Sequence, residues 1–152
     1  MTVPQCALDW AMGTVSYLHL KGDESPPALS LRPFKTIVVA ESVVSREWRN
    51  AISEWLVRSG CLYFIAWGQA CEEWHDNVDE VNLADHHDEI IPDEKFVMTT
   101  WHENEPLLEA LWFAAICAEH PAVDLDQALI IHIAPREQCA QLLALYDSAS
   151  DR

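Results

Sequence analysis

The side chains best suited to chemistry in this sequence are histidines and carboxylates in its middle third. His102 and Glu103 are adjacent and could transfer protons as a general base and a general acid. Residues 85 to 89 read Asp-His-His-Asp-Glu, and imidazole and carboxylate groups are ligands of transition metals. His86, His87 and Asp88 are therefore metal-ligand candidates, although adjacent residues usually point in different directions and no H-E-x-x-H spacing defines a shared centre. A small, metal-assisted hydrolase is the enzyme alternative that these residues leave open.

Sequence motifs that would indicate a cofactor or an activated nucleophile are missing. The four glycines do not form the G-x-G-x-x-G turn of dinucleotide-binding proteins or the G-x-x-x-x-G-K-[ST] loop that holds nucleoside triphosphates. No serine occupies a G-x-S-x-G turn, the usual setting of the nucleophile in α/β-hydrolases. We therefore expect no cofactor, and the sequence leans against an enzyme.

The strongest compositional signal is negative charge. The net charge is −16, and residues 71 to 105 hold twelve Asp or Glu residues against a single basic residue, Lys95. Such a surface repels nucleic acid and steers a basic protein toward itself, so we expect a basic protein partner and no direct binding of nucleic acid. The candidate partner-binding residues are Glu72, Glu73, Asp76, Asp79, Glu80, Asp85, Asp88 and Glu89.

By analogy of size and charge alone, this composition fits an immunity or antitoxin-type inhibitor that covers a basic toxin. Two other interpretations stay open. An acidic face can simply keep a protein in solution. The chain could also be a subunit or regulatory domain of a larger assembly.

The elements that must position these groups alternate between strand and helix. Apolar runs at 36–40, 61–66, 95–101 and 128–133 predict buried strands, and helical periodicity follows each of them, at 46–59, from 71, at 107–119 and from 135. This βαβαβαβα order predicts an α/β, three-layer sandwich with a mainly parallel four-stranded sheet. Residues 15–20 could add a fifth, N-terminal edge strand. The simplest strand order places 36–40 between 61–66 and 95–101.

Ligands of open parallel sheets bind beyond the carboxyl ends of the strands. The side chains just past these ends, which also include His102 and Glu103, are the pocket candidates: Glu41, Ser42, Trp67, Gln69, Trp101 and Arg136. Ser42 and Ser45 can equally cap a helix. His132, inside an apolar strand, is expected to be a hydrogen-bonded core residue.

The chain is expected to form one main domain in a reducing compartment. Residues 1–34 are predicted to be an N-terminal arm and Pro-rich loop packed on an α/β domain of residues 35–152. The five cysteines have mostly apolar neighbours and form no C-x-x-C pair, which favours reduced thiols. The N-terminus lacks the basic start of a signal peptide, and the longest apolar run, 110–118, is too short for a membrane span. A cytoplasmic protein is therefore predicted, with an oligomeric state that the sequence does not specify.

Overall fold

A single six-stranded sheet organises the protein. The computed structural model describes residues 6–10, 13–87 and 89–151. The strands are β1 (Cys6–Trp10), β2 (Gly13–Leu20), β3 (Phe34–Ala40), β4 (Cys61–Gly68), β5 (Met98–His102) and β6 (Gln127–Ile133). The helices are α1 (Arg46–Ser59), α2 (Cys71–Asp85), α3 (Leu107–Trp112) and α4 (Cys139–Ser150), with a 3-10 turn η1 (Asp93–Lys95) and a π-helical turn η2 (Phe113–Cys117).

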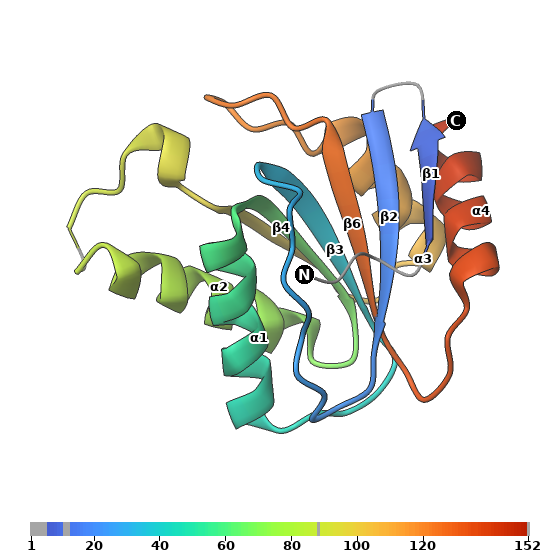
Figure 1. Cartoon of the computed structure of the whole chain (residues 1–152), viewed down its shortest axis with the longest axis horizontal. Helices are drawn as coiled ribbons and strands as arrows, with labels where there is room; N and C mark the ends of the chain where they lie inside the picture. Colours follow the sequence, from blue (N-terminus) through green and yellow to red (C-terminus); the bar gives the residue numbers. More distant parts are fainter. Residues whose placement is uncertain (1–5, 11–12, 88, 152) are drawn as a thin grey trace.

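The strand order is β1-β2-β6-β3-β4-β5 (Figure 1). Five neighbouring strands, in the spatial order β2-β6-β3-β4-β5, are parallel, and β1 adds an antiparallel edge beside β2. The predicted α/β class with a mainly parallel sheet is confirmed. The expected strand order is wrong, because β6 and β4 flank β3 while β5 lies at the edge. Strand order depends on which face each crossover covers, and the apolar pattern of a strand does not record that choice.

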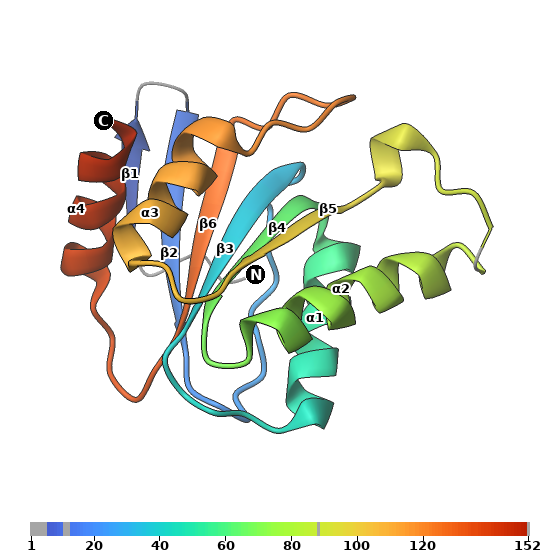
Figure 2. The ribbon, with the colours of Figure 1, turned by 180° about the vertical axis from the view of Figure 1, so that it is seen from behind.

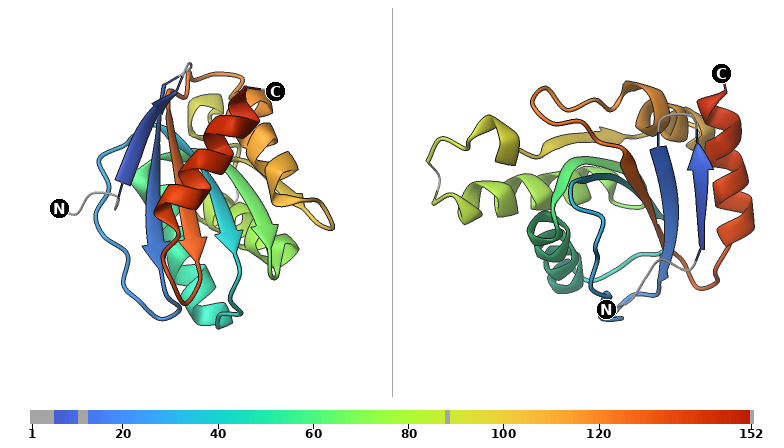
Figure 3. Two further views of the ribbon diagram at one scale, coloured as in Figure 1. Left: turned by 90° about the vertical axis from the view of Figure 1, so that its right-hand side faces the viewer. Right: turned by 45° about the horizontal axis from the view of Figure 1, so that its top comes forward.

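Two apolar layers cover the sheet. Alternate side chains of β3 point to opposite faces: Ile37 and Val39 pack with α3 and α4, whereas Val38 packs with α1 and α2. The right-hand view of Figure 3 shows α1 and α2 to the left of the strands and α4 to the right. Every residue of β3 is buried, so the predicted central strand is confirmed.

Local capping chemistry fixes α1 at its predicted bounds. The Ser45 Oγ accepts a hydrogen bond from the Trp48 backbone N–H at 3.1 Å. Gly60 ends the helix with a left-handed φ of 102°. Trp48 then packs edge-on against Trp74, which joins α1 to α2.

Three element boundaries differ from the prediction by three residues or more. The third helix stops being α-helical at Trp112 and widens into η2, where the Ala118 N–H bonds the Phe113 carbonyl. The last helix begins at Cys139 and not at Pro135. The fifth strand begins at Met98 instead of Lys95, because η1 and the bond from the Val97 N–H to the Asn82 Oδ1 hold the preceding residues.

The cysteines depart from the expectation of five reduced thiols. Cys61, Cys71 and Cys117 are free, but Cys139 is disulfide-bonded. The apolar neighbours of a cysteine in sequence do not reveal whether the fold pairs it, so the prediction is wrong for Cys139. The described part of the chain contains no helix with the length and apolar composition of a membrane span.

Candidate functional site

The parallel strands all end at one edge of the sheet, and the loops that leave β3, β4 and β6 meet at the bottom of Figure 1. The loop after β4 is tied to the end of β3 by a 2.7 Å hydrogen bond from the Gln69 N–H to the Ala40 carbonyl. Gly68 makes this approach feasible: its φ is +99°, and a Cβ there would lie 2.2 Å from the Ala40 oxygen. The residues after β3 and β4 are therefore held close together.

Two hollows share this edge. The first, of about 360 Å³, contains Glu41 and Gln69, and the second, of about 410 Å³, contains His102. Trp67, Gly68 and Ala70 line both. Five glutamates and no Lys or Arg contribute to the walls: Glu41, Glu72, Glu73, Glu103 and Glu105.

The start of α2 brings two of these carboxylates into place. Ala70, in a left-handed conformation with φ 55°, turns the chain directly into the helix without a side-chain cap. Glu72 and Glu73 then occupy the first turn, where the exposed backbone N–H groups stabilise negative charge. The carboxylates therefore gather at the hollow because the helix begins there.

His102 lies in the wall of the second hollow with only 8% of its surface exposed. Its Nδ1 is 3.0 Å from the Glu105 Oε2, and its Nε2 is 3.1 Å from the Thr100 Oγ1. The Trp67 indole N–H donates to the Glu105 carbonyl at 2.7 Å, which fixes the loop. Glu105 is thus the partner of His102, whereas the adjacent Glu103 is exposed and lines the hollow.

Both ring nitrogens of His102 are engaged. A neutral imidazole satisfies the geometry if Nδ1–H donates to Glu105 and Nε2 accepts from the Thr100 hydroxyl. Proton transfer by His102 would require Thr100 to turn away first. His102 is therefore better placed to line the hollow than to act as a general base.

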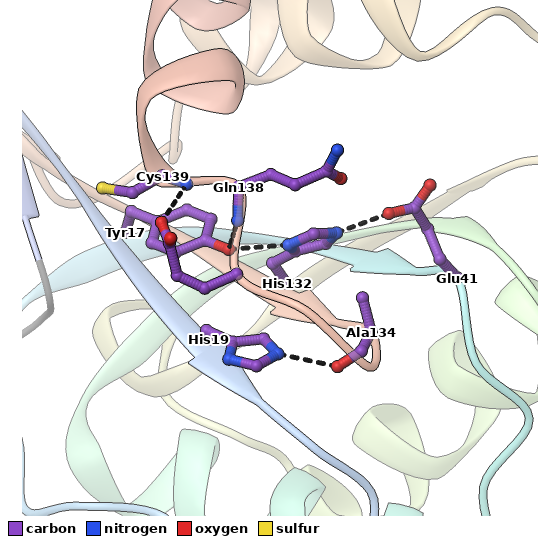
Figure 4. A network of polar contacts seen from close by, with 8 residues as sticks. Tyr17, His19, Glu41, His132, Ala134, Gln138 and Cys139 are labelled. Carbon is purple, nitrogen blue, oxygen red and sulfur yellow. Dashed lines mark hydrogen bonds and ion pairs between the residues drawn. The ribbon is translucent and has the colours of Figure 1, made fainter.

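A buried polar chain supports the first hollow (Figure 4). The Gln138 N–H donates to the Tyr17 hydroxyl at 2.9 Å, and the hydroxyl lies 2.7 Å from the His132 Nδ1. The His132 Nε2 lies 2.5 Å from the Glu41 Oε1. The Glu41 carboxylate can only accept, so Nε2–H donates to it. In a neutral imidazole Nδ1 is then the acceptor, and the Tyr17 hydroxyl donates to it.

This chain fixes one oxygen of Glu41 and leaves the rest accessible. His132 is fully buried, as predicted for a core histidine, while 44% of the Glu41 side chain is exposed. Burial raises the pKa of Tyr17, so its hydroxyl stays protonated. The sequence identifies Glu41 as a candidate but not Tyr17 and His132, which hold its carboxylate in place. Tyr17 lies on β2 and His132 on β6, and only the strand order places them beside Glu41.

A family model described as a domain of unknown function (DUF7684) matches residues 15–149. The chain belongs to this family. The matched range contains every residue that lines the two hollows of the DUF7684 domain. No curated protein and no solved structure matches the chain.

The remaining sequence candidates of the DUF7684 domain lie away from the hollows. Ser42 and Arg136 follow strands at the same edge but line neither hollow. Trp101 is exposed and its ring packs at a tilt against that of His75 of α2, with ring centroids 4.5 Å apart. His75 in turn contacts Asp76 at 2.9 Å and Asp79 at 3.5 Å, so Trp101 belongs to the acidic outer face of α2.

The metal-ligand candidates lie at the other end of α2 from the hollows. His86 is the C-terminal cap of the helix and His87 has a left-handed φ of 53°. Asp88, which is also one of the candidate partner-binding residues, falls outside the described residues. Asp85 pairs with Arg58 at 3.2 Å, and Glu89 is exposed. In the described ranges, no three His, Cys, Asp or Glu side chains are grouped to hold a metal ion.

Proposed function

We propose that this domain binds a basic protein partner, in the manner of an immunity or antitoxin-type inhibitor, through the carboxyl edge of its sheet and the outer face of α2. The observation that carries the proposal is that five glutamates and no basic residue line the two hollows at this edge. The family assignment is silent on function, so the proposal depends on the chemistry of these walls.

Among the described residues, the carboxylates at the start and on the outer face of α2 are not neutralised by basic side chains. None of Glu72, Glu73, Asp76, Asp79 and Glu80 forms an ion pair with a Lys or Arg side chain in the described part of the chain. Together with the net charge of −16, this leaves a field that would accelerate association with a basic surface and weaken as salt is added.

The hollows fit the side chains that such a partner would offer. Carboxylates bind the guanidinium group of arginine through paired, charge-assisted hydrogen bonds. Trp67, half-buried between the two hollows, adds an aromatic surface on which a cation can rest. An arginine or lysine of the partner would therefore meet both features in one place. The same charge would keep nucleic acid away.

The test compares two variants with equal changes in charge. In the first, Glu72→Gln, Glu73→Gln and Glu103→Gln remove carboxylates at the second hollow. In the control, Glu47→Gln, Asp147→Asn and Asp151→Asn remove three exposed carboxylates elsewhere. Each protein is immobilised and exposed to lysate of its native host at low and at high salt.

We expect wild type and control to retain the same basic protein at low salt, and the first variant to lose it. Retention by the first variant would contradict the proposed site. Equal loss by both variants would mean that net charge alone, and no particular surface, is responsible.

The enzyme alternative and the cytoplasmic location stay predictions. The contacts of both His102 nitrogens make it a weaker candidate for proton transfer. Disulfide bonds are rare in proteins of a reducing compartment, so the disulfide at Cys139 counts against the predicted cytoplasmic location.

A further inference from the structure

The opposite edge of the sheet holds a buried amine. Lys35 is the second residue of β3, so it lies at the amino end of the strand that Glu41 follows at the carboxyl end. A hollow of about 390 Å³ opens beside it, lined also by Glu119, His120, Asp124 and Asp126. Figure 2 shows the segment between α3 and β6, which supplies these residues, at the end of the sheet where β3 begins. This hollow is separate from the two acidic hollows and plays no part in the proposed function.

The environment of Lys35 favours a nucleophilic amine. Only 5% of the residue is exposed, and its Nζ lies 3.5 Å from the Ala118 carbonyl. Burial lowers the pKa of Lys35 to about 8, although the nearby Glu119 and Cys117 act in the opposite direction. About a quarter of the amine would then be neutral near pH 7.5, compared with roughly one part in a thousand for a solvated lysine of pKa about 10.4.

We propose that Lys35 forms an imine with a small, uncharged aldehyde that enters this hollow. The amine nitrogen attacks the carbonyl carbon, and the electron pair of the C=O bond moves to oxygen, which takes up a proton. The nitrogen gives up its two protons, which account for both protons on the departing oxygen, and its lone pair expels that oxygen as water as C=N forms. The net reaction consumes one amine and one aldehyde, releases one water, and needs no oxidant or reductant. A desolvated lysine is an established kind of nucleophile for such carbonyl chemistry.

The walls of the hollow select the charge of the ligand. Glu119, Asp124 and Asp126 repel a carboxylate-bearing aldehyde, whereas the protonated imine stays cationic and is stabilised beside Glu119. The same walls disfavour a carbamate from carbon dioxide, because that product is an anion. The volume is within the range of small-molecule sites, so an aldehyde of a few carbon atoms fits.

The experiment traps the imine with cyanoborohydride, which reduces it to a stable secondary amine. Folded protein is incubated near pH 7.5 with glycolaldehyde, and each lysine is then assigned by peptide mass mapping. The chain contains only two other lysines, Lys21 and Lys95, and both are exposed, so they serve as internal controls. We expect Lys35 to be labelled about tenfold faster than either control, or more, because of its larger neutral fraction.

Two comparisons make the proposal falsifiable. In urea the preference for Lys35 should vanish, since it depends on the fold. Glyoxylate, an anionic aldehyde of the same carbon number, should label Lys35 more slowly than glycolaldehyde does, and Glu119→Gln should narrow that difference. Labelling of Lys35 no faster than of Lys21 and Lys95 in the folded protein would overturn the site. Equal labelling by the two aldehydes would overturn the assigned class of ligand.

Discussion

Tyr17, His132 and Glu41 form a chain of hydrogen bonds: Tyr17 and His132 each donate one and accept one, and the Glu41 carboxylate at the end accepts from His132. Such buried chains stabilise a fold only while every member is paired, because an unpaired buried group carries its full desolvation cost. Glu41 is the one member that reaches solvent, so the chain holds a carboxylate at the rim of the first hollow with a fixed orientation.

Tyr17→Phe tests this chain. The change leaves the His132 Nδ1 and the Gln138 N–H without their partner, so we expect a loss of about 1 to 3 kcal/mol in the free energy of unfolding, measured by urea denaturation. Tyr63→Phe is the matched control on β4, because the Tyr63 hydroxyl makes no hydrogen bond within the described residues. Its effect should stay within about 0.5 kcal/mol. Equal effects of the two changes would show that the chain contributes no stability.

Lys35 gives a pH dependence of known sign. Its pKa in the folded protein is about 8, below its value in the unfolded chain, so between about pH 8 and pH 10 the unfolded state binds more protons. Stability due to Lys35 therefore rises with pH across that window and is lowest below pH 8. We expect Lys35→Met to be more stable than wild type near pH 7, with a gap that narrows by about 2 to 3 kcal/mol toward pH 10.

The comparison with Lys35→Met is essential because other groups also make stability depend on pH. The pKa values of Tyr17, Tyr63 and Tyr146 are raised in the folded protein, so these residues lower the free energy of unfolding as the pH rises above about 10. They are present in both proteins and cancel. A gap between the two unfolding curves that stays constant from pH 7 to pH 10 would contradict the burial of a titrating amine.

At the scale of elements, the crossing from β4 into α2 positions both acidic hollows. Gly68→Ala should therefore be costly: the new Cβ meets the backbone oxygen of Ala40, which cannot swing away as a side chain can. We expect a loss of about 2 kcal/mol or more in the free energy of unfolding. Gly22→Ala, in an exposed loop with a nearest contact of 3.4 Å, should be nearly neutral. A neutral Gly68→Ala would mean that this loop is not held as described.

The sequence predicts elements well where the decisive interactions are local. The bounds of α1 follow from Ser45 and Gly60, which act within a single turn of the helix. The buried strands β3, β4 and β6 follow from their apolar runs, whereas β5 lies at the edge of the sheet and most of its residues are only half-buried. The π-helical turn at Phe113–Cys117 and the late start of α4 were not predictable in this way, because they depend on packing against the sheet.

The candidate site was predicted in part, for the same reason. Glu41, Trp67, Gln69 and His102 were found because carboxyl ends of parallel strands share one edge. The pairing of His102 with Glu105 and of Glu41 with His132 depends on a turn at Asn104 and on the order of strands. Neither leaves a pattern in the sequence.

Across the whole molecule, the two edges of the sheet differ in the charged groups that they carry. The carboxyl edge gathers glutamates around two hollows, whereas the amino edge encloses one buried amine among acidic residues. We propose that the carboxyl edge receives a cationic side chain of the partner, because glutamates and no basic residue line its two hollows.

The most direct test is a titration of the labelled protein with a pentaarginine peptide, followed by NMR. The chain has seven tryptophans, whose indole N–H signals report separate places on the molecule, and that of Trp67 donates to the Glu105 carbonyl between the hollows. We expect the Trp67 indole and the amides of Gly68, Glu72 and Glu103 to shift most. Glu72→Gln with Glu73→Gln and Glu103→Gln should weaken the affinity by about tenfold, since each exposed ion pair contributes up to about 1 kcal/mol. Glu47→Gln with Asp147→Asn and Asp151→Asn should leave it nearly unchanged. Shifts spread evenly over the acidic surface, or equal losses in the two variants, would contradict the account.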